Sequence, residues 1–140
     1  MTPRTFLVIE DDLVYGWIVV RELGALAPAA TIYLVETGRE GLTFSTAGGQ
    51  RDGGPTPSLI VLDHHLPDMR GTAMLRALVA AGRTLPPVLV LSQAVWPQDQ
   101  AEMNDAGVGA FVRKPRKRSE LRAILAAFLA ENLTADGFQG

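Results

Sequence analysis

Short apolar runs alternate along the chain with longer segments in which apolar residues recur at the spacing of a helix. The short runs are rich in β-branched residues and lie at 5–9, 31–35, 59–62, 88–91 and 110–112. The longer segments lie at 13–26, 37–47, 72–81, 98–106 and 119–132. Strands that alternate with helices indicate parallel βαβ units. The pattern therefore predicts an α/β fold with a doubly wound, five-stranded parallel sheet, (βα)5.

Three glycines and one serine affect how the predicted helices are expected to begin, end or weaken. Gly38 and Gly41 weaken the helix predicted at 37–47, because glycine inside a helix costs about 1 kcal/mol relative to alanine. Gly82 is suited to end the helix at 72–81. Ser119 is expected to cap the start of the last helix.

Composition limits the classes of protein to which the chain can belong. The 140 residues fit one domain with a real core, and 47% apolar and 20% charged residues are ordinary for a globular protein. The net charge of −2 argues against a general binder of nucleic acid or membranes, and the lack of cysteine excludes disulfides and thiolate metal sites. No segment has the pattern of a signal peptide or a spanning helix. We expect a soluble, cytoplasmic protein.

Polar residues follow or end four of the predicted strands. Glu10, Asp11 and Asp12 follow the first strand, Asp63 ends the third, Ser92 the fourth, and Arg113, Lys114 and Pro115 the fifth. Because ligands bind at the carboxyl ends of parallel strands, we expect these side chains to converge. Clustered carboxylates repel one another unless a cation offsets them, and hard oxygen ligands suit Mg²⁺. A neighbouring lysine and hydroxyl would bind phosphoryl oxygens, which favours phosphoryl transfer onto an aspartate.

The residues around these strand ends resemble those of a response-regulator receiver domain of the CheY-like type. The motifs that carry the resemblance are Phe6-Leu7-Val8-Ile9-Glu10-Asp11-Asp12, Val61-Leu62-Asp63 with Leu66-Pro67-Asp68-Met69-Arg70-Gly71, Val90-Leu91-Ser92, and Phe111-Val112-Arg113-Lys114-Pro115. The resemblance implies a flavodoxin-like sheet with the strand order 2-1-3-4-5. It also implies a receiver domain at 1–132, followed by a short flexible tail at 133–140.

By this resemblance, Asp63 is the phosphoacceptor and the ligands of Mg²⁺ surround it. Asp11 and Asp63 would bind the ion directly, and Glu10 would act through water. The backbone carbonyl of His65 is the remaining protein ligand that the resemblance implies. Asp12 is expected to start the following helix instead of binding the metal.

The resemblance also implies a set of residues that respond to the phosphoryl group. Ser92 matches the hydroxyl that moves toward the group, and Lys114 matches the lysine that contacts it. The peptide bond between Lys114 and Pro115 is expected to be cis. Phe111 stands at the position of the aromatic switch residue, and a plain core position is the alternative for it.

The function that the resemblance implies is signalling, not enzymatic turnover. We expect a single-domain response regulator of a two-component phosphorelay, phosphorylated by a sensor histidine kinase. With no output domain expected after 132, its partners would be a downstream protein or a histidine phosphotransferase. A homodimer could form through the fourth helix, fifth strand and fifth helix. The Gly- and Pro-rich segment 47–58 is expected to form a flexible loop, and a long loop here resembles regulators paired with phytochrome-type kinases.

Two other functions stay open at the level of sequence. His65 and Gln93 depart from the residues usual in the family, which leaves room for a receiver-like module that binds or dimerises without phosphorylation. Asp63-His64-His65 also matches the signature of the DHH phosphoesterases, but those hydrolases need further Asp and His motifs. The chain has two histidines only. Adjacent residues of an extended segment point to opposite sides, which disfavours a metal site shared by this pair.

Overall fold

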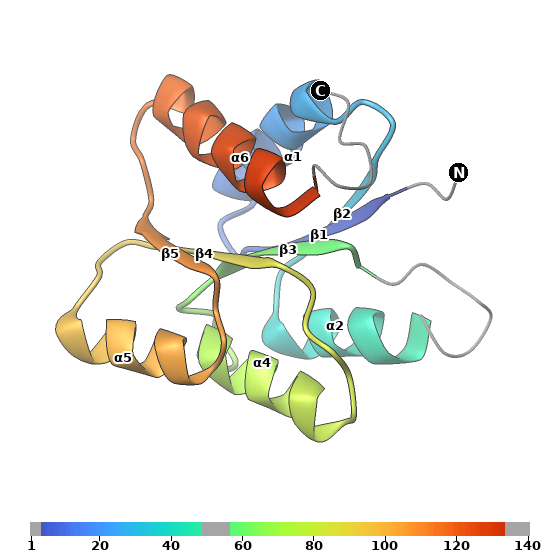
Figure 1. Cartoon of the computed structure of the whole chain (residues 1–140), viewed down its shortest axis with the longest axis vertical. Helices are drawn as coiled ribbons and strands as arrows, with labels where there is room; N and C mark the ends of the chain where they lie inside the picture. The colour runs from blue at the N-terminus through green and yellow to red at the C-terminus, as the bar shows by residue number, and fades with distance from the viewer. Residues whose placement is uncertain (1–3, 49–56, 134–140) are drawn as a thin grey trace.

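The computed structural model describes residues 4–48 and 57–133. The tail predicted at 133–140, except for Leu133, and most of the loop predicted at 47–58 lie outside these residues. The strands are β1 (Thr5–Ile9), β2 (Thr31–Val35), β3 (Leu59–Asp63), β4 (Val88–Ser92) and β5 (Ala110–Arg113). The helices are α1 (Leu13–Leu26), α2 (Gly38–Thr43), η1 (Phe44–Gly48), α4 (Gly71–Ala80), α5 (Pro97–Asp105) and α6 (Arg118–Leu133), labelled as in Figure 1.

The strands of the described residues form one parallel sheet. Their order is β2-β1-β3-β4-β5, and each pair of neighbours runs parallel. Helices α1 and α6 cover one face of the sheet, and α2, α4 and α5 cover the other (Figure 1). The predicted doubly wound fold and its strand order are confirmed.

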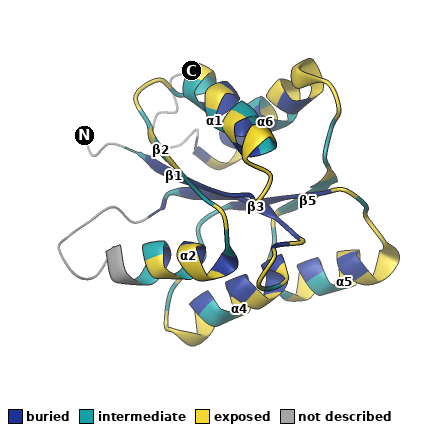
Figure 2. Ribbon diagram, turned by 180° about the vertical axis from the view of Figure 1, so that it is seen from behind, coloured by how far each residue is buried: buried dark blue, intermediate teal, exposed yellow. Residues whose placement is uncertain are grey.

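Because helices cover both faces, the central strands are buried on both sides. Every residue of β1, β3 and β4 is buried, as the dark blue centre of Figure 2 shows. Successive side chains of a strand point to opposite faces. Phe6 and Val8 of β1 pack with α1 and α6, whereas Leu7 and Ile9 pack on the other face. This double burial explains why the sequence shows continuous apolar runs and not an alternating pattern. None of the described helices has the length and apolar character needed to cross a membrane.

The helix predicted at 37–47 changes its geometry midway. Its regular part, α2, ends at Thr43, and the chain continues as the π-helical turn η1. Close packing accounts for the two glycines that weaken it. A Cβ atom on Gly41 would lie 2.6 Å from Cδ1 of Ile9, and one on Gly38 would lie 2.5 Å from Cγ of Met69. The glycines therefore let α2 approach both the sheet and the loop after β3.

Of two residues expected to end or cap a helix, one does so and the other does not. Gly82 ends α4 with a φ of 84°, as its position predicted. Ser119 does not cap the last helix, because α6 begins at Arg118 and Ser119 lies in its first turn. The N-terminal end of a helix depends on the backbone conformation of the chain that enters it, and the preference of serine for a cap position does not fix that conformation.

The expected cis bond between Lys114 and Pro115 is also wrong, since no cis peptide bond occurs in the described part of the chain. For a bond that precedes proline, the trans form is favoured by about 0.5–1 kcal/mol. In this conformation the carbonyl of Pro115 accepts a hydrogen bond of 3.4 Å from the hydroxyl of Tyr15.

A buried carboxylate ties α1 to α6. Glu22 is 2% exposed and accepts hydrogen bonds of 2.6 Å from Nε of Arg122 and 2.7 Å from Nη2 of Arg118. The hydrogen bond from Arg122, with that from Arg118, holds the pKa of Glu22 below its usual value. The contact fixes the start of α6, and with it the chain that leaves β5.

Replacing Gly41 by alanine should destabilise the fold, although alanine is the better helix former. Alanine removes a helix penalty of about 1 kcal/mol, but overpacking against Ile9 costs about 1–3 kcal/mol. We expect the free energy of unfolding in urea to fall by about 1 kcal/mol.

The matched control for this variant is Gly24→Ala in α1. There the added Cβ would lie 3.9 Å from Cδ1 of Ile32, which is ordinary contact. Alanine should stabilise this position by up to about 1 kcal/mol. An equal gain in both variants would contradict the packing role of Gly41.

Candidate functional site

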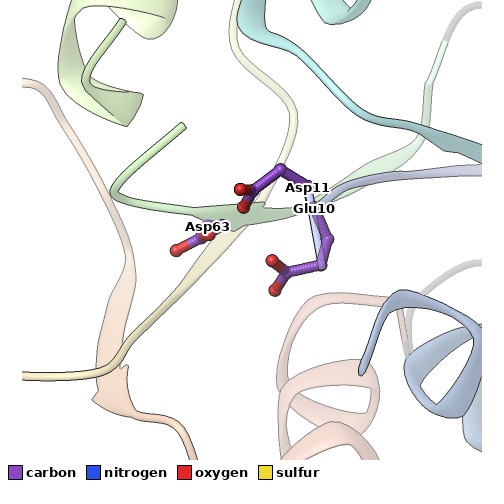
Figure 3. Close-up of side chains that lie close together, drawn as sticks. All are labelled: Glu10, Asp11 and Asp63. Atoms are coloured by element: carbon purple, nitrogen blue, oxygen red, sulfur yellow. The ribbon is translucent and has the colours of Figure 1, made fainter. Parts of the chain in front are cut away.

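Three carboxylates meet where β1 and β3 end (Figure 3). Glu10 and Asp11 follow β1, and Asp63 is the last residue of β3. One oxygen from each of the three lies within 4.8 Å of the others. Glu10 and Asp63 are buried, whereas Asp11 is exposed. The structure thus brings together the predicted acidic residues, while Asp12 caps α1 by accepting a hydrogen bond from the N–H of Tyr15, as expected.

Lys114 supplies a positive charge that faces these acids. Its backbone N–H donates to the carbonyl of Ser92 at 2.7 Å, which fixes the chain after β5 beside the end of β4. Its Nζ lies 2.8 Å from Oε1 of Glu10 and 3.6 Å from Oδ2 of Asp63. The same atom lies 4.9 Å from the centre of the Tyr15 ring. The ammonium group therefore stands between the two buried carboxylates.

Burial changes the titration of this cluster. It raises the pKa of Glu10 to about 7, and although the hydrogen bond from Lys114 opposes the rise, the charge of Asp63 adds to it. Burial, and then the charge of Glu10, raise the pKa of Tyr15 to about 12. Carboxylates held in this way are stabilised as anions by any further cation that binds among them.

The chain after Asp63 folds back as a tight loop. The N–H of Gly71 donates to the carbonyl of His64 at 2.8 Å, which closes the loop. A Cβ on Gly71 would lie 3.2 Å from the carbonyl oxygen of Asp63, so glycine lets α4 begin this close to β3. The N–H of His65 donates to Oδ1 of Asp63 at 3.2 Å, while the His65 imidazole is exposed. The role of the His65 carbonyl as a metal ligand stays a prediction.

Asp68 anchors the same loop to α2, a contact that the sequence reasoning missed. Its Oδ1 accepts from the N–H of Gly38 and its Oδ2 from the N–H of Arg39, both at 2.9 Å. The carboxylate thus satisfies two free N–H groups at the start of a helix that lies about 30 residues earlier in the chain. Sequence spacing does not reveal a cap supplied from so far away.

Ser92 and Phe111 lie at neighbouring strands but make different contacts. Ser92 is fully buried, and its hydroxyl donates to the carbonyl of Ala94 at 2.8 Å. The hydroxyl is therefore bonded to the chain that leads into α5. Phe111 of β5 is half-buried and packs with the core cluster on the α4 side of the sheet. Its ring meets the ring of His64 edge to face, with the centroids 6.1 Å apart.

The burial of His64 and its contacts at this edge of the sheet were not predicted from the sequence. It is fully buried, and Nε2 lies 3.3 Å from Nη2 of Arg70. Burial, followed by the charges of His65 and Arg70, lowers the pKa of His64, which favours the neutral imidazole. The expectation that the two histidines point apart is wrong: their ring centroids lie 4.6 Å apart, because the chain bends after β3 and does not stay extended. The partners of His64 come from distant elements, so no local pattern signals them.

The arrangement suits a divalent cation and a phosphoryl group. The acidic cluster offers hard oxygen atoms, the ligand type that Mg²⁺ and similar ions prefer. The ammonium group of Lys114 and the hydroxyl of Ser92 are donors of the kind that bind phosphoryl oxygens. Among the described residues, Glu10, Asp11 and Asp63 are the one group of three or more acids or histidines close enough to share an ion.

Comparison with known proteins gives consistent matches. The sequence model of one protein family, described as the response regulator receiver domain, matches residues 6–126 of this chain. The transcriptional regulatory protein KdpE of Mycobacterium tuberculosis is 34% identical over 109 residues, which cover 76% of this chain and 47% of KdpE. The chain spans about half the length of the curated relatives it matches.

Solved structures show the same fold at lower identity. The phosphorylated cyanobacterial phytochrome response regulator RcpA has a TM-score of 0.83 and 21% identity, and the match covers 99% of this chain and 100% of RcpA. The Mn²⁺-bound form of the response regulator Rcp1 has a TM-score of 0.75 and 22% identity, with 91% and 93% covered. Together with the match over residues 6–126, the fold and the strand-end residues lead to one conclusion: this chain belongs to the family of response regulator receiver domains.

Proposed function

We propose that this domain is the phosphorylated component of a two-component system and that Asp63 accepts the phosphoryl group from a sensor histidine kinase. The observation that carries the proposal is the ammonium group of Lys114, held between buried Glu10 and buried Asp63. A cation fixed beside a buried carboxylate can stabilise the charge of a phosphoryl group bound there. The domain would act as a cytoplasmic signalling module and not as an enzyme that turns over a substrate.

The acidic cluster would hold Mg²⁺ for this reaction. Its ligands would be the carboxylates of Asp11 and Asp63, Glu10 through water, and the backbone carbonyl of His65. The ion, when bound, supplies positive charge to the phosphoryl oxygens. The fit rests on the three carboxylates that lie close together at this edge of the sheet.

In the transfer step, a carboxylate oxygen of Asp63 attacks the phosphorus atom of the donor. The bond between phosphorus and the nitrogen of the kinase phosphohistidine breaks, and its electron pair stays on the imidazole. Lys114 exchanges part of its contact with Glu10 for a charge-assisted hydrogen bond to a phosphoryl oxygen. The hydroxyl of Ser92 gives up the carbonyl of Ala94 and donates to the phosphoryl group, because an anionic acceptor binds a hydroxyl more strongly.

Under this proposal, protein partners would bind at two surfaces. Leu13, Val14 and Trp17 on the first turns of α1 are 42%, 74% and 57% exposed, and they follow the acidic residues directly. This apolar patch suits the protein that presents the phosphohistidine. The output would pass through α5, β5 and α6, to a downstream protein, a histidine phosphotransferase or a second copy of the chain. The likeness in fold to RcpA makes a phytochrome-type kinase a reasonable first choice of donor.

Incubation with acetyl phosphate and Mg²⁺ should add a single phosphate to the protein. Intact-mass measurement should show the gain in the wild type and none in Asp63→Asn, which lacks the nucleophile. The matched control is Asp12→Asn, which alters the same acidic edge but keeps a good helix cap and should still be phosphorylated. Lack of any gain in the folded wild type, together with no binding of beryllofluoride, would favour a module that acts without phosphorylation.

The affinity for Mg²⁺ should fall as the pH drops below about 7. The pKa of Glu10 is about 7, so at pH 6 most of the protein carries a proton that opposes binding of the cation. We expect binding about tenfold weaker at pH 6 than at pH 8 by isothermal titration calorimetry, with release of a proton.

The same raised pKa has a consequence for stability without metal. Because the folded state binds the proton of Glu10 more tightly than the unfolded chain does, stability should fall as the pH rises from 4.5 to about 7. Glu10→Gln should remove both dependences on pH. A Mg²⁺ affinity that is flat between pH 6 and pH 8 would show that Glu10 is not a protonated group of the site.

A further inference from the structure

A polar cluster joins the loop after Asp63 to α5. Arg70, the last residue before α4, donates from Nη2 to Oδ1 of Asp99 at 3.2 Å and from Nε to Oε1 of Glu102 at 3.2 Å. The hydroxyl of Thr72 donates to the same oxygen of Glu102. The imidazole of His64 lies against Arg70 and 3.7 Å from Asp99. We call these residues, His64, Arg70, Thr72, Asp99 and Glu102, the Arg70 clamp.

The clamp joins a half-exposed arginine to buried partners: the side chain of Arg70 is 51% exposed and that of Glu102 is 27% exposed. His64 and Thr72 are 0% and 1% exposed, and Asp99 is 3% exposed. Asp99 also accepts from the N–H of Trp96, so it holds the first turn of α5 as well as Arg70. The rest of α5 adds little apolar anchoring, since Met103 is its one buried apolar residue. Polar contacts therefore carry much of the attachment of this helix.

The chain that leads into α5 is held at a second point by the hydroxyl of Ser92, which donates to the carbonyl of Ala94. Under the proposed function this second hold is lost on phosphorylation, because Ser92 turns to the phosphoryl group. The clamp is then the remaining contact between α5 and the loop after β3, and it has to break before the helix is released. His64 of the clamp directly follows the phosphoacceptor Asp63 in the chain, and its ring packs on Phe111. A shift of the loop after β3 would therefore displace α5 through the contacts of the clamp.

We propose that the Arg70 clamp restrains α5 against α4 in the unphosphorylated protein and sets how readily a phosphoryl group on Asp63 releases that helix. Arg70 is a positioning residue in this device, because it acts on α5 and touches no reacting atom. The proposal rests on the proposed function and adds its regulation. A contact made in only one of two states shifts their equilibrium by the free energy of that contact. Removing the clamp should thus raise the population of the released state before any phosphorylation.

The test compares Arg70→Met with Arg76→Met, which replaces an exposed arginine of the helix α4 that follows Arg70. Hydrogen exchange of the α5 amides is measured with and without beryllofluoride, a mimic of the phosphoryl group. In Arg70→Met we expect α5 to exchange about tenfold faster without beryllofluoride, as one lost contact of this kind shifts the equilibrium. Beryllofluoride should bind about three- to tenfold more tightly than to wild type. Arg76→Met should match wild type in both measurements.

Glu102→Ala provides a second variant that keeps the proposal testable. The side chain of Glu102 is 27% exposed, so its removal leaves no buried charge without a partner. Exchange of α5 and affinity for beryllofluoride should both rise, by a smaller factor than in Arg70→Met. Exchange and beryllofluoride affinity equal to wild type in both variants would overturn the clamp. Faster exchange that is uniform over β1, β3 and α5 in both variants would also overturn it, because the contacts would then hold the whole domain together.

The two proposals fail in different ways. If wild type gains no phosphate and binds no beryllofluoride, the proposed function fails. The exchange of α5 in the absence of beryllofluoride still tests the clamp by comparison of Arg70→Met with Arg76→Met. If wild type is phosphorylated but α5 exchanges alike in all the variants, the clamp alone is wrong.

Discussion

The approach of like charges at one edge of a parallel sheet is the constraint on which the rest of this site depends. β1 and β3 run side by side and end together, so Glu10, Asp11 and Asp63 meet whether or not their charges favour it. Two of these carboxylates are buried, and their repulsion is offset within the described residues by Lys114. The same shortage of positive charge is what makes this edge of the sheet receptive to a cation.

The sequence was informative wherever a property repeats along the chain. The apolar runs predicted the strands, and the helical spacing predicted the helices to within a few residues. The rule that ligands gather at the carboxyl ends of parallel strands brought Glu10, Asp63 and Lys114 together correctly. The family resemblance supplied the strand order, which periodicity alone does not contain.

The sequence was uninformative wherever a contact joins distant positions. Arg70 meets Asp99 across 29 residues and Asp68 caps α2 across 30, and neither spacing has a local signature. The glycines of α2 illustrate the same limit, because propensity marks Gly41 as a weakness while its approach to Ile9 makes it a requirement. The cis bond before Pro115 was expected from the family resemblance alone, and the observed trans bond is the form that a bond before proline favours.

The cap that Asp68 places on α2 has a consequence for how this protein opens locally. α2 has six residues, fewer than the number at which an isolated helix holds together in water. Besides its packing on the sheet and its cap from Thr37, it depends on the loop after β3, which supplies acceptors for two of its N–H groups and is itself anchored where α2 begins. We therefore expect α2 and the loop after β3 to open together, because opening of either segment removes hydrogen-bond partners of the other. A protease that cuts α2, or a denaturant that unfolds it, should therefore expose the loop after β3 at the same time.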